Sequence, residues 1–215
     1  MLSVSILKQL DFSDADKLLR KYKIKTPPFG IAKTPHDAVK IARKIGYPVV
    51  MKIISPDILH KTERKGVIVG LKSDSEVEKS FEEIRKHAGK AKFKGMLIQK
   101  QVEGKETIIG GKKDPQFGAV VLFGLGGIFV EVMKDVSLRI APIDKREAME
   151  MIKEVKGYPI LAGIRGQKPV NLEKLAEMIA SVSRMLSEND IQELDLNPVL
   201  VNDKECLPVD VRMMK

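Results

Sequence analysis

The 215-residue sequence has a single cysteine, no tryptophan and only 5% aromatic residues. One cysteine excludes an internal disulfide bond and is typical of a reducing compartment, so we expect a cytoplasmic protein. No apolar run approaches the ~20 residues that a membrane-spanning helix needs. The first residues are mixed polar and charged, which is unlike a secretory signal. We therefore expect no membrane partner.

The scarcity of aromatic side chains also bears on nucleic-acid binding. Net charge is +9, and residues 1–113 hold 25 Lys and Arg against 13 Asp and Glu. A basic half is one signature of a nucleic-acid-binding module, which is the remote alternative here. Base-stacking surfaces also need aromatic residues among the cations, and the chain has only seven Phe and three Tyr. We expect no nucleic-acid partner, and a basic part that binds polyphosphate instead.

Hydrophobic periodicity predicts alternating helices and strands, and hence an α/β fold with two lobes. The predicted domains are residues 1–97 and 98–215, with a ligand cleft at their junction. We expect residues 157–169 to form a loop. The predicted helices cover residues 13–23, 35–45, 74–88, 144–155 and 171–187. The predicted strands cover residues 48–54, 66–72, 96–102, 106–110, 118–124, 129–133, 136–141, 191–201 and 206–211.

Lys52 lies in the middle of the apolar strand at 48–54 and precedes a polar loop that contains His60. A buried lysine costs several kcal/mol unless an anion meets it, although the lysine of an edge strand can simply face solvent. The neutral imidazole of a histidine is a competent nucleophile near pH 7. The pair therefore indicates phosphate chemistry.

Two further segments offer groups that a nucleotide needs. The extended segment of Gln99, Lys100, Gln101 and Val102 links the lobes, and its backbone can read an adenine edge. Glu106 on the next strand can accept a hydrogen bond from a ribose hydroxyl. This signal is weak, because many hairpins share it.

A glycine turn between two apolar strands, at Gly126 and Gly127, allows backbone amides to approach a phosphate. A tight hairpin explains the same glycines equally well. The turn matches neither the dinucleotide-binding fingerprint nor the Walker pattern.

Polar residues alternate along the strand at 191–201. Glu193, Asp195 and Asn197 share one face, and Asp210 faces them from the last strand. Carboxylate and amide oxygens suit Mg²⁺, with phosphate oxygens completing its shell. A strand edge that merely faces water is the alternative. Pro198 argues against that alternative, because it indicates a bend or bulge within the strand.

Taken in order, the motifs span most of the chain. The sequence resembles the β subunits of ADP-forming acetyl-CoA synthetases, which are ATP-grasp proteins related to succinyl-CoA synthetase. The residues that carry this resemblance are 46–52, 55–62, 114–118, 124–131, 135–137, 139–142 and 194–198. The family usually has two glycines after its histidine loop, where Lys65 and Gly66 stand here.

The resemblance implies an ATP-grasp fold that binds ATP or ADP together with Mg²⁺. It places Lys52 on a nucleotide phosphate and Asn197 and Asp210 on the metal, with Asp195 supporting the metal or the phosphohistidine. Residues 99–102 and Glu106 would hold adenosine.

In the same family, His60 corresponds to the phosphohistidine of the loop at residues 55–66. Arg139 and the amides of Gly126 and Gly127 would offset charge on the transferring phosphoryl group.

The implied enzyme is an acid–CoA ligase that converts acyl-CoA, ADP and phosphate to the acid, CoA and ATP. This chain would act with a separate CoA-binding α subunit, in an α2β2 assembly. Two other ATP-grasp roles stay open, a carboxylate–amine ligase and the nucleotide half of a protein acyltransferase. Neither of these needs a phosphohistidine.

Overall fold

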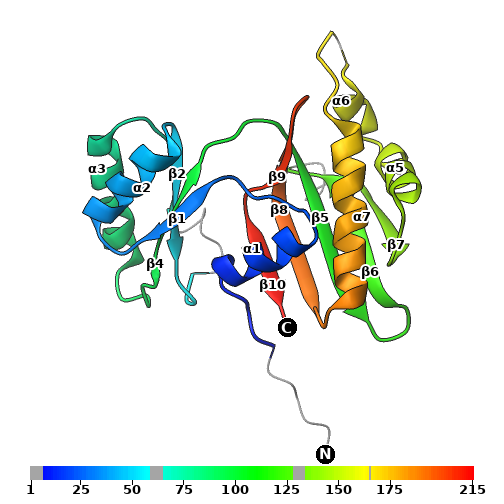
Figure 1. Ribbon diagram of the computed structural model, residues 1–215, viewed down its shortest axis with the longest axis horizontal. Coiled ribbons are helices and arrows are strands. Elements are labelled where there is room, and N and C mark those ends of the chain that lie inside the picture. Colours follow the sequence, from blue (N-terminus) through cyan, green and yellow to red (C-terminus); the bar gives the residue numbers. More distant parts are fainter. Residues whose placement is uncertain (1–6, 59–64, 128–133, 165) are drawn as a thin grey trace, which may run out of the picture. The chain divides into compact units, whose positions relative to one another are not determined.

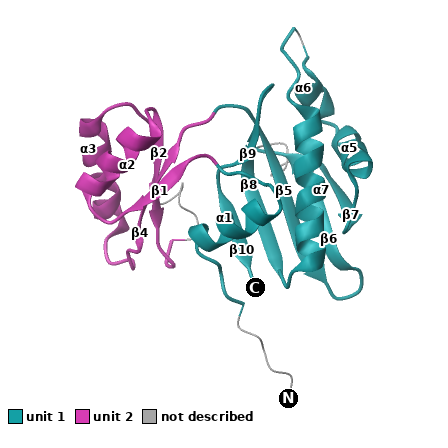
Figure 2. Cartoon of the chain, viewed as in Figure 1, with its two compact units in different colours: residues 1–26, 103–215 teal, residues 27–102 magenta. Residues whose placement is uncertain are grey.

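The computed structural model describes residues 7–58, 65–127, 134–164 and 166–215. The chain folds into two compact units, which are coloured separately in Figure 2. Unit 2 is the continuous stretch Pro27–Val102, and unit 1 combines Met1–Thr26 with Glu103–Lys215. No helix among the described residues is both long enough and apolar enough to cross a membrane.

Unit 2 is a four-stranded antiparallel sheet in the order β1-β4-β2-β3, with two helices packed against it (Figure 1). Its apolar core joins the strands to both helices. The strands are β1 (Phe29–Ala32), β2 (Val49–Ile54), β3 (Val67–Leu71) and β4 (Gly95–Lys100), and the helices are α2 (Pro35–Ile45) and α3 (Asp74–Ala88).

Local sequence signals account for the two helices of unit 2. Thr34 caps α2, because its Oγ1 accepts a hydrogen bond from the Asp37 backbone N–H, and Pro35 occupies the first turn. The helix ends at Gly46, whose φ of 86° suits glycine. Ser73 caps α3 in the same way. The predicted bounds of both helices are confirmed.

Unit 1 is a six-stranded sheet in the order β10-β8-β5-β6-β7, with β9 paired to β8. Helix α7 packs against β5 and β6, and α5 packs against β7 (Figure 1). The strands are β5 (Lys105–Asp114), β6 (Gly118–Leu125), β7 (Val136–Ile140), β8 (Glu193–Val201), β9 (Cys206–Pro208) and β10 (Val211–Met214). The helices are α1 (Phe12–Lys21), α5 (Lys145–Glu154), α6 (Tyr158–Ala162) and α7 (Leu172–Glu188).

A bulge in β8 decides which of its residues face the core. Between the pairs Thr107–Val199 and Ile109–Leu196, two residues of β8 oppose one residue of β5. Leu194 and Leu196 are buried before the bulge, and Val199 and Val201 are buried after it. The extra residue therefore resets the alternation and keeps all four in the core. The bulge that Pro198 predicts is confirmed.

Several expected elements differ from the structure. Helix α1 begins at Phe12 and has Asp11 as its N-cap, because the Asp11 carboxylate accepts from the Asp14 N–H. Strand β1 was not expected, and residues 158–162 form α6 within the expected loop. The predicted strand at 129–133 lies outside the described residues.

The expected boundary between residues 97 and 98 falls within β4, so unit 2 extends to Val102. Helix α1 belongs to unit 1, because Ala15 and Leu19 are buried in the core of that unit.

Two phenylalanines allow a direct test of this core. Phe123 is fully buried, whereas Phe117 is 54% exposed. We expect Phe123→Ala to lower the free energy of unfolding by about 3–5 kcal/mol, because it leaves a cavity. Phe117→Ala should change it by less than about 0.5 kcal/mol. Urea denaturation measures both, and equal effects would contradict the assigned core.

Candidate functional site

In unit 2, Lys52 and Gln99 form a buried polar pair on neighbouring strands. Lys52 is 7% exposed and Gln99 is 1% exposed. The Lys52 Nζ donates to Gln99 Oε1 at 3.1 Å. The Gln99 Nε2 is buried and has no hydrogen-bond partner in the structure as described. An unsatisfied buried donor costs about 1–3 kcal/mol, so this amide group fits a place where a ligand acceptor binds.

The neighbouring side chains are engaged within unit 2 itself. Lys100 Nζ donates to the carbonyl oxygens of Gly46 and Tyr47, at 3.0 and 2.8 Å. Gln101 Oε1 accepts from the Gly70 N–H at 2.7 Å. Lys100 thus holds the turn between α2 and β2, and Gln101 holds strand β3, so a nucleotide role for this segment falls to Gln99 and to the backbone near Val102.

The predicted phosphohistidine, His60, lies outside the described residues. The chain is anchored on both sides of residues 59–64. Before them, Ile58 is 8% exposed in the core, and Asp57 Oδ2 accepts from the Lys92 N–H at 2.6 Å. After them, the Gly66 carbonyl accepts from the Ile53 N–H at 2.8 Å.

Lys65 has a φ of 52°, in the left-handed region that favours glycine. The glycine that the resemblance leads us to expect at this position would adopt this conformation without steric cost.

In unit 1, three of the predicted polar residues of β8 lie on the sheet face opposite the core. Glu193 and Asn197 are exposed and Asp195 is half-buried, while Leu194 and Leu196 between them are buried. Strand β10 pairs Arg212 with Asp195 and Val211 with Leu196. Asp210, one residue before β10, is therefore level with Asn197. The structure thus brings Asp210 near the polar residues of β8, and their role as metal ligands stays a prediction.

The two aspartates of this group repel each other. Burial raises the pKa of the Asp195 carboxyl, and the negative charge of Asp210 raises it further, against the opposing effect of Arg212. A cation between the two carboxylates would remove this repulsion. Asp195, Asn197 and Asp210 thus fit a hard divalent ion such as Mg²⁺.

Within the described residues, no group of three or more His, Cys, Asp or Glu side chains is arranged to hold a metal. Two carboxylates and one amide leave most of a Mg²⁺ shell to phosphate oxygens and water, as is usual for Mg²⁺ at phosphate sites.

The glycine turn lies directly against Glu106. Gly126 donates its N–H to the Glu106 carbonyl at 2.8 Å, and a Cβ on Gly126 would lie 2.8 Å from the Glu106 Cβ. Gly127 has a φ of 65°. The glycines therefore permit a close approach of the turn to β5. Because the Gly126 amide is used within the sheet, Gly127 is the residue left to offer an amide to a phosphate.

Arg139 faces helix α5. Its Nε donates to Glu147 Oε1 at 2.6 Å, and its two terminal nitrogens bond to Glu154. These hydrogen bonds raise the pKa of the Arg139 guanidinium. The predicted contact with a transferring phosphoryl group would break both ion pairs, so we leave Arg139 out of the proposed phosphate site.

Asp135 is a positioning residue to which the sequence reasoning gave no role. It is 7% exposed, and its carboxylate accepts from the N–H groups of Lys156 and Gly157, each at 2.8 Å. A Cβ on Gly157 would lie 2.9 Å from Leu125, the last residue of β6. Asp135 thus packs the segment after α5 against the strand that leads into the glycine turn. The only signal in the sequence was an isolated Asp-Val-Ser.

The two antiparallel sheets, with a buried lysine on one and carboxylates on the other, agree with the fold class that the family comparison gives, the ATP-grasp domain. The model of the ATP-grasp domain matches residues 5–214. The chain is 46% identical over 207 residues to the beta subunit of ADP-forming acetate–CoA ligase I of Pyrococcus furiosus, covering 94% of this chain and 89% of that subunit. The chain belongs to this family of ATP-grasp beta subunits.

Single-chain relatives are longer. The chain is 46% identical to ADP-forming acetate–CoA ligase I of Archaeoglobus fulgidus, covering 92% of this chain but 30% of the relative. Among solved structures, an acetyl-coenzyme A synthetase 1 of Ca. Korarchaeum cryptofilum, in complex with coenzyme A and Ca-AMPCP, has a TM-score of 0.93 and 42% identity. The match covers 96% of this chain and 93% of that one. Other structures of that enzyme contain Mg-AMPPCP or a phosphorylated phosphohistidine segment.

The raised pKa of Asp195 predicts a pH-dependent cost to stability. Because the folded-state pKa lies above the ordinary value of 3.8, ionised Asp195 destabilises the fold above that pH, and the cost vanishes as the pH falls towards 3.8. We expect Asp195→Asn to raise the urea midpoint at pH 7 in EDTA, and to raise it less at pH 4.5.

The exposed Asp203→Asn is the control and should change neither midpoint. A stabilisation by Asp195→Asn that is independent of pH would contradict the assigned repulsion.

Proposed function

We propose that this chain is the nucleotide-binding subunit of an ADP-forming acid–CoA ligase. The reaction is acyl-CoA + ADP + phosphate in equilibrium with acid + CoA + ATP. The chain acts with a CoA-binding α subunit, in an α2β2 assembly in the cytoplasm, and is inactive alone. Membership of the beta-subunit family supports this assignment, and the chain spans 89% of a beta subunit but 30% of a single-chain ligase.

The observation that carries the nucleotide role is the buried Lys52–Gln99 pair with its unsatisfied amide. Lys52 supplies a positive charge in a site from which water is largely excluded, where it attracts a phosphate oxygen strongly. The Gln99 Oε1 holds the ammonium in place, and the Gln99 Nε2 offers an N–H to a nucleotide acceptor. Glu106 accepts from a ribose hydroxyl.

Asn197 and Asp210 would hold Mg²⁺ and Asp195 would support it. The bound ion would neutralise charge on the nucleotide phosphates. On the protein side, the Gly127 amide binds a phosphoryl oxygen.

His60 carries the phosphoryl group between the two subunits. A ring nitrogen forms a bond to phosphorus as the N–P bond to a histidine of the α subunit breaks. That N–P bond breaks as a β-phosphate oxygen of ADP bonds to the same phosphorus, which yields ATP and regenerates the neutral imidazole. Such transfer depends mainly on in-line placement and charge neutralisation.

The relay is tested with His60→Asn. We expect this chain of the assembled variant to incorporate no acid-labile label from acetyl-CoA and labelled phosphate, because asparagine forms no phosphoramidate. Its ADP affinity should match that of the wild type in titration calorimetry. Survival of ADP-dependent phosphate transfer in the variant would instead favour an ATP-grasp ligase without a phosphohistidine.

Substitution of Lys52 on β2 and of Lys100 on β4 distinguishes a loss of ADP binding from a loss of stability. Lys52→Met removes the buried cation at nearly constant volume, and we expect ADP affinity to fall about 10–100-fold, the worth of a charge-assisted hydrogen bond. Lys100→Met loses bonds to Gly46 and Tyr47, so it should lower the melting temperature with little effect on ADP affinity. Calorimetry measures the ADP affinity of both variants, and thermal unfolding measures their melting temperatures. Weaker ADP binding by Lys100→Met than by Lys52→Met would refute the role of Lys52.

A further inference from the structure

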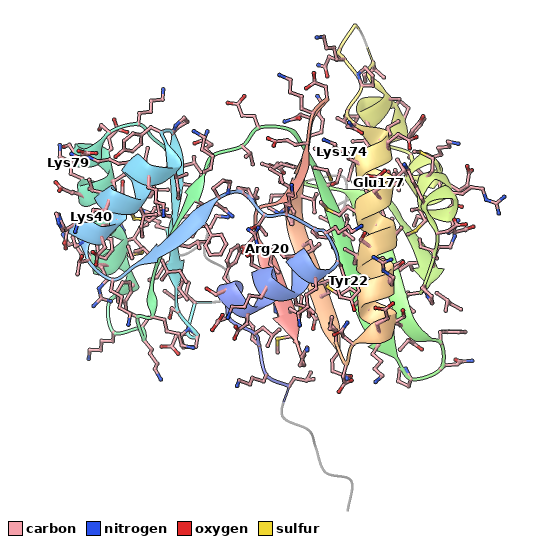
Figure 3. All side chains as sticks on the ribbon, in the orientation of Figure 1. Arg20, Tyr22, Lys40, Lys79, Lys174 and Glu177 are labelled. Atoms are coloured by element: carbon pink, nitrogen blue, oxygen red, sulfur yellow. The ribbon has the colours of Figure 1, made fainter. Side chains whose placement is uncertain are left out.

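Unit 1 contains a pocket that the proposed function does not use. A pocket of about 760 Å³ lies between α7, the segment after α1, the start of α5 and the turn before β9. Lys174 and Glu177, which are labelled on α7 in Figure 3, belong to its lining. The pocket is on the helical side of the sheet, whereas Asp195 lies on the opposite face. Its occupant is therefore not the nucleotide of the candidate site.

The lining is strongly basic. It carries only two acidic residues, Glu177 and Glu205. Against them stand six cations, Lys23, Lys25, Lys145, Lys174, Arg184 and Lys204. A net positive charge of this size in a concave surface attracts an anionic partner.

Three of these six cations are held in place by contacts with other residues of the chain. Lys145 pairs with Glu173 and Glu177, each at 2.7 Å. Lys174 donates to the carbonyl of Lys204. Arg184 lies over the Tyr22 ring, 5.7 Å from its centroid. The exposed side chains of Lys23, Lys25 and Lys204 add flexible charge around this ordered frame.

The floor of this pocket, which we call the basic groove, is apolar. Ile24 is 2% exposed, Met178 7% and Cys206 8%. Arg184 also lines a neighbouring hollow of about 500 Å³, together with Tyr22 and Glu188. The two hollows follow one face of α7, a 17-residue helix about 25 Å long. This elongated shape suits a polypeptide segment with acidic and apolar side chains.

Small phosphorylated ligands fit the groove less well. Their sites use glycine-rich backbone nests or arginine forks. The lining contains no glycine and one arginine. Lysines around an apolar floor favour carboxylates spread along a chain.

We propose that this basic groove docks an acidic segment of the CoA-binding subunit, an inference that rests on the proposed function. Two observations support that partner. The groove offers charge complementarity to an acidic chain, and in single-chain relatives the sequence matched here is only 30% of a longer polypeptide, so further segments are covalently tethered to it there. A second copy of this chain, with its net charge of +9, is a poor match.

Photo-crosslinking tests the groove directly. Cys206 is the only cysteine, and burial raises the pKa of its thiol to about 12, so it resists maleimides at pH 7. Ser181→Cys in the groove therefore accepts a single benzophenone-maleimide. In the assembled complex we expect a crosslink to an acidic peptide of the CoA-binding subunit, identified by mass spectrometry. Lys79→Cys on α3 is the control position (Figure 3) and should give none.

Charge reversal gives the energetic test. In Lys25→Glu/Arg184→Glu/Lys204→Glu, we expect affinity for the CoA-binding subunit to fall at least ~10-fold at low salt, and to depend less on KCl. Lys40→Glu/Lys79→Glu/Lys86→Glu changes the net charge equally, but on α2 and α3, and should leave that affinity within ~2-fold. Sedimentation velocity measures both.

The outcomes separate this inference from the proposed function. Unchanged assembly of the groove variant, or a crosslink from position 181 to a second copy of this chain or to a segment without acidic residues, overturns the docking site alone. Wild-type subunits that neither bind ADP nor assemble overturn both.

Discussion

The pairing of β5 with β8 is the constraint on which the rest of unit 1 depends. It joins residues about 90 positions apart and lies at the centre of the six-stranded sheet. The bulge in this ladder keeps Leu196 and Val199 in the core while Asn197 faces away from it. A regular strand would turn either the aliphatic side chains or the polar ones to the wrong face. The same pairing holds Glu106 on the strand beside Asp195 and Asn197, so packing of the core and placement of the polar oxygens are one arrangement.

In unit 2 the main constraint is different: burying polar groups costs free energy. Lys52 and Gln99 lie among apolar residues, and the Gln99 Nε2 has no hydrogen-bond partner within the described residues. A folded protein tolerates this cost where a bound ligand supplies the missing hydrogen bond. The nearby Lys100 and Gln101, which look equally suited to a nucleotide in the sequence, bond instead to the backbone of the turn before β2 and of strand β3. Polarity alone therefore does not distinguish a binding residue from a structural one.

Much of the fold was predictable, because its signals are local. The caps at Thr34 and Ser73, with apolar residues at helical spacing after them, specify α2 and α3. Helix α1 starts one residue before the predicted start at 13, because the Phe12 side chain packs against the core and Asp11 caps the helix. Strand β1 and helix α6 are too short for periodicity to reveal them, and both owe their form to contacts with distant segments, β4 for the strand and the core through Leu161 for the helix.

The sequence by itself determined the family, the buried lysine of β2 and the one-sided array of Asp195 and Asn197, because each of these follows from motifs or from the two-residue period of a strand. Only the tertiary structure decided that Arg139 pairs with glutamates of α5, that the Gly126 amide serves the sheet, and that lysines from four separate segments surround one groove. The physical reason is the same in each case. Whether a polar group binds a ligand or another part of the protein depends on the partners that folding brings close to it. Those partners are far away in the sequence.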